Sequence, residues 1–262
     1  MRKTIWFLPG LAFVLGALGS FLRWLQLLSR VEEETGFYTP GAQSVVLALY
    51  GILAVLGLAW AVSRFPGFRE PLPTGYDALL LPPRLHLGLS ALVGLLFLAG
   101  AALLFSESGT SEKLGTLLRV LGVLSLLSAA AAPLGVLDLR REEGPGNKSC
   151  LYAMIPLAMS CFWLITTYWE HSADPVLWGY ALELLGICAV ILGYYYAAGF
   201  ACGRPQPRRT LLFGLLSCFF ALVHLADAEA LGRQLLFLAS ALQQLLWAMA
   251  LIRRTLRTSP EA

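Results

Sequence analysis

The chain has 262 residues, of which 58% are hydrophobic and only 13% are charged. Soluble domains carry about 25% charged residues, so this composition excludes a soluble enzyme and indicates a protein dissolved in a lipid bilayer. The net charge of +3 is small, and the basic residues are spread over short loops, which excludes a basic nucleic-acid-binding domain.

Eight apolar segments follow one another along the chain, each about as long as a bilayer crossing requires. They lie at residues 5–28, 43–63, 85–105, 115–137, 150–169, 175–198, 209–226 and 231–252. We expect the first to be retained rather than cleaved as a signal peptide, because its apolar run continues past the small residues that could form a cleavage site. The only long connection, residues 64–84, is expected to lack strands and to lie on the membrane surface. The sequence therefore predicts an all-α fold, a polytopic bundle of eight transmembrane helices.

The first two segments carry a family resemblance. They read "LPGLAFVLGALGSFLRWLQLL" and then "ETGFYTPGA" before a second apolar run. This stretch resembles a group of uncharacterised multi-pass membrane proteins of anaerobic Firmicutes. The resemblance implies a protein of the bacterial cytoplasmic (inner) membrane, and it implies no activity and no functional residue.

The basic residues predict the orientation of the bundle. With eight spans, all of the 19 Lys and Arg residues fall on one side of the membrane except Arg23, Arg30, Lys113, Arg119 and Arg233. Because loops rich in Lys and Arg stay in the cytoplasm, both termini are predicted to be cytoplasmic.

Two parts of the chain indicate an internal duplication. Residues 40–55, "PGAQSVVLALYGILAV", match residues 175–190, "PVLWGYALELLGICAV", at seven of sixteen positions. The fourth and eighth segments also share an arginine at each end. The sequence thus predicts two four-helix units, residues 1–141 and 149–257, within a single membrane domain. Units of four helices share one orientation, as in parallel-repeat transporters, so a pathway would lie where they meet.

A carboxylate, Glu183, lies inside the sixth segment. Gly179, Gly186 and Gly193 recur every seven residues on nearly the same helix face, and small residues of this kind mark a face packed against another helix. Glu183 is therefore expected to be buried in the outer half of the bundle rather than exposed to lipid.

An unpaired charge at this depth would be costly, so we expect Glu183 to be balanced by a cation. Arg23 and Arg119 are the predicted partners, since each lies about one turn inside its own helix end. His224 and Arg233 are expected at the mouth of the same polar region, with Arg233 reaching towards the interface.

The eighth segment carries a polar stripe that includes Arg233 and Gln244 on one helix face. We expect Gln243 to form an interhelical hydrogen bond, whereas Gln244 could either do the same or line a solute path. The predicted ligand or ion-pair residues are Glu183, Arg23, Arg119, Arg233, His224 and Gln244.

Two His-x-x-Asp pairs, His171/Asp174 and His224/Asp227, follow the fifth and seventh segments. Two imidazoles and two carboxylates could hold a divalent metal. The alternative is that they are ordinary polar residues where two helices leave the membrane.

Common motifs of membrane enzymes and nucleotide-driven pumps are absent. The sequence has no H-E-x-x-H, no G-x-S-x-G and no G-x-x-x-x-G-K-[ST]. We therefore predict no catalytic residue and no cofactor.

Three functions compete. The first is a transporter or permease for a small solute. An excess of arginines over Glu183 would leave positive charge available for an anionic solute. The second is a non-catalytic accessory, assembly or sensing protein, and the third is a lipid-modifying membrane enzyme. Membrane lipid and a small solute are the expected partners.

Overall fold

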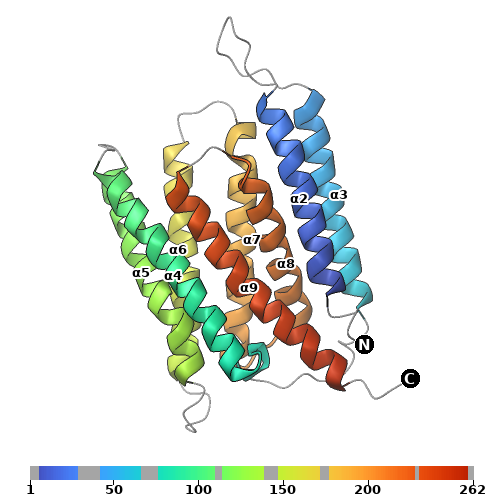
Figure 1. Cartoon of the computed structure of the whole chain (residues 1–262), viewed down its shortest axis with the longest axis vertical. Coiled ribbons are helices and arrows are strands. Elements are labelled where there is room, and N and C mark those ends of the chain that lie inside the picture. The colour runs from blue at the N-terminus through green and yellow to red at the C-terminus, as the bar shows by residue number, and fades with distance from the viewer. Residues whose placement is uncertain are drawn as a thin grey trace, which may run out of the picture.

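The computed structural model describes residues 6–28, 42–65, 76–109, 114–138, 147–171, 177–227 and 230–258. Within these ranges the chain forms eight α-helices, one short 3-10 helix and no strand (Figure 1). They are α2 (Phe7–Leu28), α3 (Ala42–Arg64), η2 (Tyr76–Leu79), α4 (Pro83–Ser108), α5 (Gly115–Asp138), α6 (Asn147–Glu170), α7 (Leu177–Ala201), α8 (Pro207–His224) and α9 (Leu231–Thr258). Each predicted segment coincides with one helix, so the all-α prediction is confirmed.

Seven of these helices are long and apolar enough to cross a membrane, and α8 is the exception. It has only 18 residues, and its first turn contains Arg208 and Arg209. It also packs against α2, α3, α7 and α9. A helix enclosed by other helices needs less apolar surface than one exposed to lipid. The chain is therefore a multi-pass membrane bundle, in which an eighth crossing by α8 stays a prediction.

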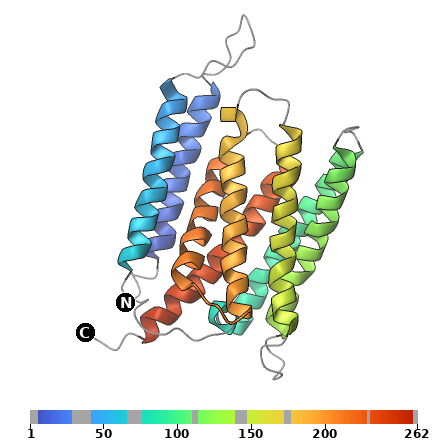
Figure 2. The ribbon, with the colours of Figure 1, turned by 180° about the vertical axis from the view of Figure 1, so that it is seen from behind.

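The helices form three groups, which Figures 1 and 2 show from opposite sides. α4 and α5 pair on one side, α2 and α3 pair on the other, and α6 to α9 lie between them. The first outer pair docks on α9 through α4 and on α6 through α5, and the second docks mainly on α8 through α2. Helices of the two predicted units thus interleave, while the duplication itself stays a prediction from the sequence.

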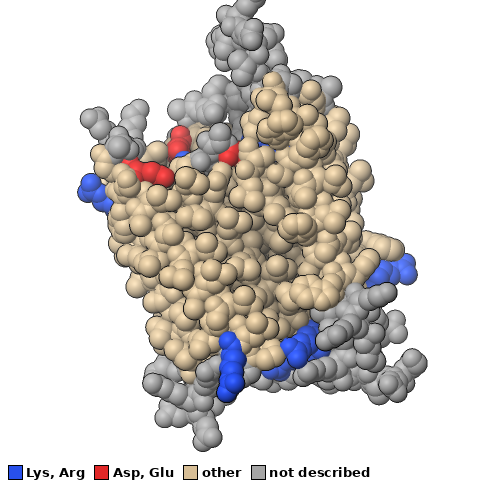
Figure 3. Space-filling model, in the orientation of Figure 1, with Lys and Arg blue, Asp and Glu red and all other residues tan. Residues whose placement is uncertain are grey.

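The charged residues segregate to the two ends of the bundle (Figure 3). We call the end where α2 begins and α9 ends the basic end; it carries Arg64, Arg84, Arg204, Arg208, Arg209, Arg253 and Arg254. At the opposite, acidic end lie all four carboxylates whose side chains the structure describes, namely Glu107, Glu170, Glu183 and Asp227. The predicted cytoplasmic position of the basic end follows the positive-inside rule and stays an expectation.

Part of the long connection packs inside the bundle. In η2 and the residues after it, Ala78, Leu79 and Leu81 are buried, and η2 packs against α7 and α9. The Leu81 amide donates a hydrogen bond of 3.3 Å to His86 Nδ1 at the start of α4. The prediction of a surface position is therefore wrong for this part, because its apolar side chains find cover between helices.

Glycines set the closest helix contacts. A Cβ added to Gly16 of α2 would lie 2.7 Å from Leu222 of α8, and one at Gly193 of α7 would lie 2.0 Å from Gln244 of α9. Gly186 faces Phe237 and Phe220 in the same way. The predicted packed face of α7 is thus confirmed at Gly186 and Gly193.

Candidate functional site

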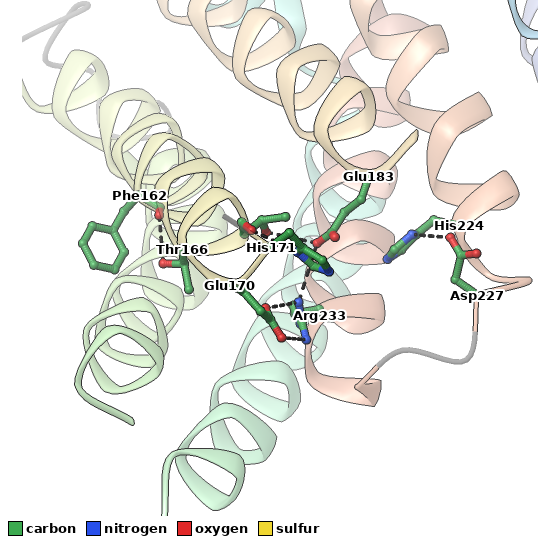
Figure 4. Close-up of polar contacts among 9 residues, drawn as sticks. Phe162, Thr166, Glu170, His171, Glu183, His224, Asp227 and Arg233 are labelled. Atoms are coloured by element: carbon green, nitrogen blue, oxygen red, sulfur yellow. Dashed lines mark hydrogen bonds and ion pairs between the residues drawn. The ribbon is translucent and has the colours of Figure 1, made fainter. Parts of the chain in front are cut away.

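Arg233, in the first turn of α9, is the centre of an ionic cluster at the acidic end (Figure 4). Its Nη1 and Nη2 donate hydrogen bonds of 2.6 and 3.0 Å to the two carboxylate oxygens of Glu170, the last residue of α6. Nη1 also lies 3.9 Å from Glu183 Oε1 on α7. A bidentate arginine–carboxylate pair fixes orientation as well as charge, so Arg233 joins the ends of three helices.

Glu183 is 2% exposed, which confirms that it is buried. The Thr167 hydroxyl of α6 donates a hydrogen bond of 3.1 Å to Glu183 Oε1. The predicted pairing is wrong, since the ion pair of Glu183 is with Arg233 instead of Arg23 or Arg119. Arg119 is exposed and its Nε donates a hydrogen bond of 3.4 Å to Ser108 Oγ, since α5 packs mainly on α4 and α6 rather than on α7.

A third carboxylate, Glu107, reaches the same arginine from α4. A Cβ added to Gly232, the residue before Arg233, would lie 3.3 Å from Glu107 Oε1. Glu107 interacts electrostatically with both Arg233 and Glu170. We call Arg233, Glu107, Glu170 and Glu183 the Arg233 cluster. Arg233 is only 11% exposed and is bonded to Glu170 at the end of α6, so its position relative to the membrane interface stays a prediction.

A second cluster lies at the end of α8 and joins it to α2 and α3. Arg23 Nε donates a hydrogen bond of 2.5 Å to Asp227 Oδ1, and His224 Nδ1 lies 3.1 Å from Asp227 Oδ2. Arg23 Nη1 also donates to Gln26 Oε1 at 2.9 Å, and Gln26 Nε2 donates to the Ser44 hydroxyl at 2.7 Å. We call these five residues the Arg23 cluster.

Asp227 stays ionised within this cluster. Burial by itself raises the pKa of the Asp227 carboxyl, since a charged group loses water. The hydrogen bond with His224 and the positive charges of Arg23 and His224 outweigh burial, so the pKa lies below its ordinary value of 3.8. Arg23 and Asp227 therefore form a buried ion pair at neutral pH.

Aromatic rings close the space beneath the Arg233 cluster. Phe237 lies one turn after Arg233 on α9, and its ring centroid is 4.5 Å from that of Trp163 on α6. The His224 ring lies 4.5 Å from Phe237 on the α8 side. Trp163 and Phe237 are both fully buried, so they separate the ionic groups from the deeper interior.

Gln244 forms the interhelical bond that we expected of its neighbour Gln243. Gln244 Nε2 donates a hydrogen bond of 2.7 Å to the Val190 carbonyl of α7. Its carbonyl oxygen accepts a hydrogen bond of 2.6 Å from the Ser217 hydroxyl of α8. The amide therefore ties three helices together at the level of Gly193.

Gln243 instead borders a small polar cavity of about 10 Å³. His86, Tyr194 and Trp247 also line it. Within the described part of the chain, neither Gln243 Oε1 nor His86 Nε2 has a hydrogen-bond partner. Because the Leu81 amide donates to His86 Nδ1, the neutral ring carries its proton on Nε2. The cavity offers at least one donor and one acceptor, and it has room for about one water molecule.

This cavity lies between the two predicted units. Its walls come from α4 and α5 of the first unit and from α6, α7 and α9 of the second. The two units and a pathway between them stay predictions.

Of the proposed metal ligands that the structure describes, His224 and Asp227 lie together, and His171 makes other contacts. The His171 ring stacks on Tyr180 at 4.6 Å, and its Nδ1 lies 3.0 Å from the Thr167 carbonyl. His224 and Asp227 instead belong to the Arg23 cluster. Among the residues that the structure describes, no three His, Cys, Asp or Glu side chains form a group that could hold a metal ion. Asp174 lies outside the described residues.

Glu107, Glu170 and Thr167 also belong to the site, and none of them was predicted from the sequence. A signal for the two carboxylates was present, since each lies at the end of a helix whose direction places it beside Arg233. Thr167 carries no such signal, because a threonine within an apolar helix most often bonds only its own backbone.

No protein-family model, curated protein or solved structure matches the chain. The site must therefore be interpreted from its own chemistry.

Proposed function

We propose that the protein transports a small polar or cationic solute, with Glu183 as the group that binds the solute or a proton. The observation that supports this best is the charge balance of the Arg233 cluster. Among the described residues, three carboxylates, on α4, α6 and α7, lie around one guanidinium. Excess negative charge is costly where one carboxylate, Glu183, is buried, and uptake of a proton or a cation relieves it.

The same balance argues against an anionic solute. That expectation required arginines in excess around Glu183, whereas Arg119 is exposed and Arg23 is paired with Asp227. The remaining arginine, Arg233, is already held by Glu170. The described residues of the site thus favour a positive ligand.

The proposed path of the solute follows α9, which borders both polar regions of the bundle. Arg233 and Gln243 are ten residues apart, about 15 Å along the helix, and they border the ionic cluster and the polar cavity respectively. Trp163 and Phe237 lie between these two polar regions. We interpret this arrangement as a closed state, in which the aromatic pair must move before the solute passes. Alternating access between repeated units is the mechanism that such an arrangement fits.

A second candidate is a non-catalytic accessory, assembly or sensing protein. It is favoured by the bonds of Gln244 to α7 and α8 and by the small volume of the polar cavity. In that case the buried polar groups would only hold helices together, as amides in membrane helices commonly do.

Flux measurements separate the two candidates. The purified chain is reconstituted in liposomes that contain a pH-sensitive dye, and inward gradients of sodium, potassium, methylammonium, amino acids and neutral sugars are applied in turn. A transporter gives a solute-dependent flux for at least one class, and Glu183→Gln abolishes it.

Asp227→Asn is the matched control, since it removes a buried carboxylate at the same end that belongs to the other cluster. It should lower thermal stability while keeping the flux. If Glu183→Gln lowers stability and leaves the flux unchanged, Glu183 is only structural. If no class moves through the unsubstituted protein, the transport proposal is wrong.

A further inference from the structure

A groove opens on the side of the bundle, between α3 and α7. Its volume is about 550 Å³, and its floor consists of Phe213, Leu216 and Phe220 of α8. We call it the lateral groove. The residues of α3 and α7 along its walls are almost all apolar, and several of them are exposed where the groove faces the space that lipid would occupy.

Polar side chains gather at one end of the lateral groove. Arg23, Gln26 and Ser44 line this end, and each is at least 95% buried. They belong to the Arg23 cluster, in which Asp227 fixes the arginine in place. The groove is thus charged and hydrogen-bonding at the acidic end of the bundle and apolar along the rest of its length.

The length of the groove matches one leaflet of a bilayer. Its α3 wall runs from Ser44 to Leu56 and its α7 wall from Ala181 to Leu192, which at 1.5 Å per residue is about 16–18 Å. Half of a hydrocarbon core of about 30 Å is about 15 Å. The volume also falls within the range of about 300–1,000 Å³ that is typical of small-molecule sites.

We infer that the lateral groove binds one acyl chain of a phospholipid from the leaflet at the acidic end. The phosphate and ester oxygens lie beside Arg23 and Gln26 and accept hydrogen bonds in addition to those that these side chains make with Asp227 and Ser44, since a guanidinium carries five N–H groups and an amide two. A free phosphate would occupy only the polar end and would leave the apolar walls of the groove without a partner, whereas an acyl chain covers them. The proposed ligand is therefore a lipid. This inference is independent of the transport proposal.

Gly51 offers a way to fill the groove without disturbing the helices. It lies in the α3 wall, and a Cβ added there has no atom within 4 Å. Gly57, two turns further along α3, has the same open surroundings but does not line the groove. Gly51→Phe and Gly57→Phe are therefore a matched pair with the same change in side chain and in helix propensity.

The test uses the full-length chain, purified and delipidated in detergent. Palmitoyl-oleoyl phosphatidylglycerol is added to the micelles, and bound lipid is counted by native mass spectrometry. We expect one retained lipid in the unsubstituted protein and in Gly57→Phe, and at least a tenfold lower occupancy in Gly51→Phe. Glycerol 3-phosphate alone should not bind, whereas its retention at the polar end would mean that the site takes a phosphate and not a lipid.

A second pair keeps the test valid if Gly51→Phe does not fold. Cys188 lines the facing α7 wall and Cys161 of α6 lies outside the groove, and both are exposed. Cys188→Phe should reduce lipid retention and Cys161→Phe should not. Equal retention in all four variants would overturn the inference, because the bound lipid would then lie elsewhere on the bundle.

Discussion

At the scale of single residues, Arg233 is the cation at the centre of the Arg233 cluster. It forms ion pairs with both Glu170 and Glu183 and interacts electrostatically with Glu107 as well. Removing the cation from a buried ion pair leaves an uncompensated charge, which typically costs about 3–5 kcal/mol. Partial protonation of the carboxylates would offset some of this loss.

We therefore expect Arg233→Gln to lower the free energy of unfolding by about 3 kcal/mol, measured by titration with a denaturing detergent in mixed micelles. Arg119→Gln is the control, because Arg119 lies at the same end but is exposed, and it should change stability by no more than about 0.5 kcal/mol. Equal losses in the two variants would show that the Arg233 cluster does not stabilise the bundle.

Residue positions within a helix could be read from the sequence, but their partners could not. The glycine spacing of α7 correctly placed Glu183 on a buried face. Its cation depended on which helices are neighbours, and Arg23 turned out to bond Asp227, which is 204 residues away in the chain. Gln243 and Gln244 are adjacent, so only the final helix rotation decided which of them bonds across helices.

At the scale of helices, the seam between α2 and α8 depends on a close approach at Gly16. A Cβ added there would lie 2.8 Å from Leu222 Cβ, which is fixed to the α8 backbone and cannot turn away. The same substitution at Gly10, on the same helix, meets no atom within 4 Å. Crowding in a packed seam costs about 1–3 kcal/mol, whereas helix propensity favours alanine over glycine by about 1 kcal/mol.

Gly16→Ala should therefore destabilise the protein and Gly10→Ala should leave it unchanged or slightly more stable. Thermal unfolding of both variants in detergent, followed by the loss of monomer in gel filtration, distinguishes these outcomes. A Gly16→Ala protein as stable as Gly10→Ala would mean that α2 can move away from α8 at little cost.

The helices themselves were predictable because a bilayer crossing demands a long apolar run. The position of η2 was not, since Ala78, Leu79 and Leu81 give an apolar signal that fits either a membrane surface or a helix interface. The central position of α8 in the bundle could not be predicted from the sequence either. Its two arginines and short length indicate a helix covered by other helices, but they do not predict which helices those are.

At the scale of the whole molecule, charge segregation predicts how the bundle lies in the membrane. Cys202 lies just beyond α7 at the basic end and is exposed. If that end is cytoplasmic, a membrane-impermeant maleimide should label a variant that retains only Cys202 in broken cells and not in intact ones. Labelling in intact cells would reverse the orientation, and with it the leaflet assigned to the lateral groove.

The long separation between Arg23 and Asp227 has a consequence for synthesis. At about 5–20 residues per second, a ribosome needs about 10–40 s to add the 204 residues between them. Throughout that interval α2 is already made while the carboxylate that will neutralise its arginine does not exist. A guanidinium in hydrocarbon costs several kcal/mol, so the newly made α2 must keep Arg23 near the headgroups or in contact with the insertion machinery. Docking of α2 onto α8 is then a late step of assembly, and it brings the arginine to its final depth only once α8 and the Asp227 that follows it have emerged.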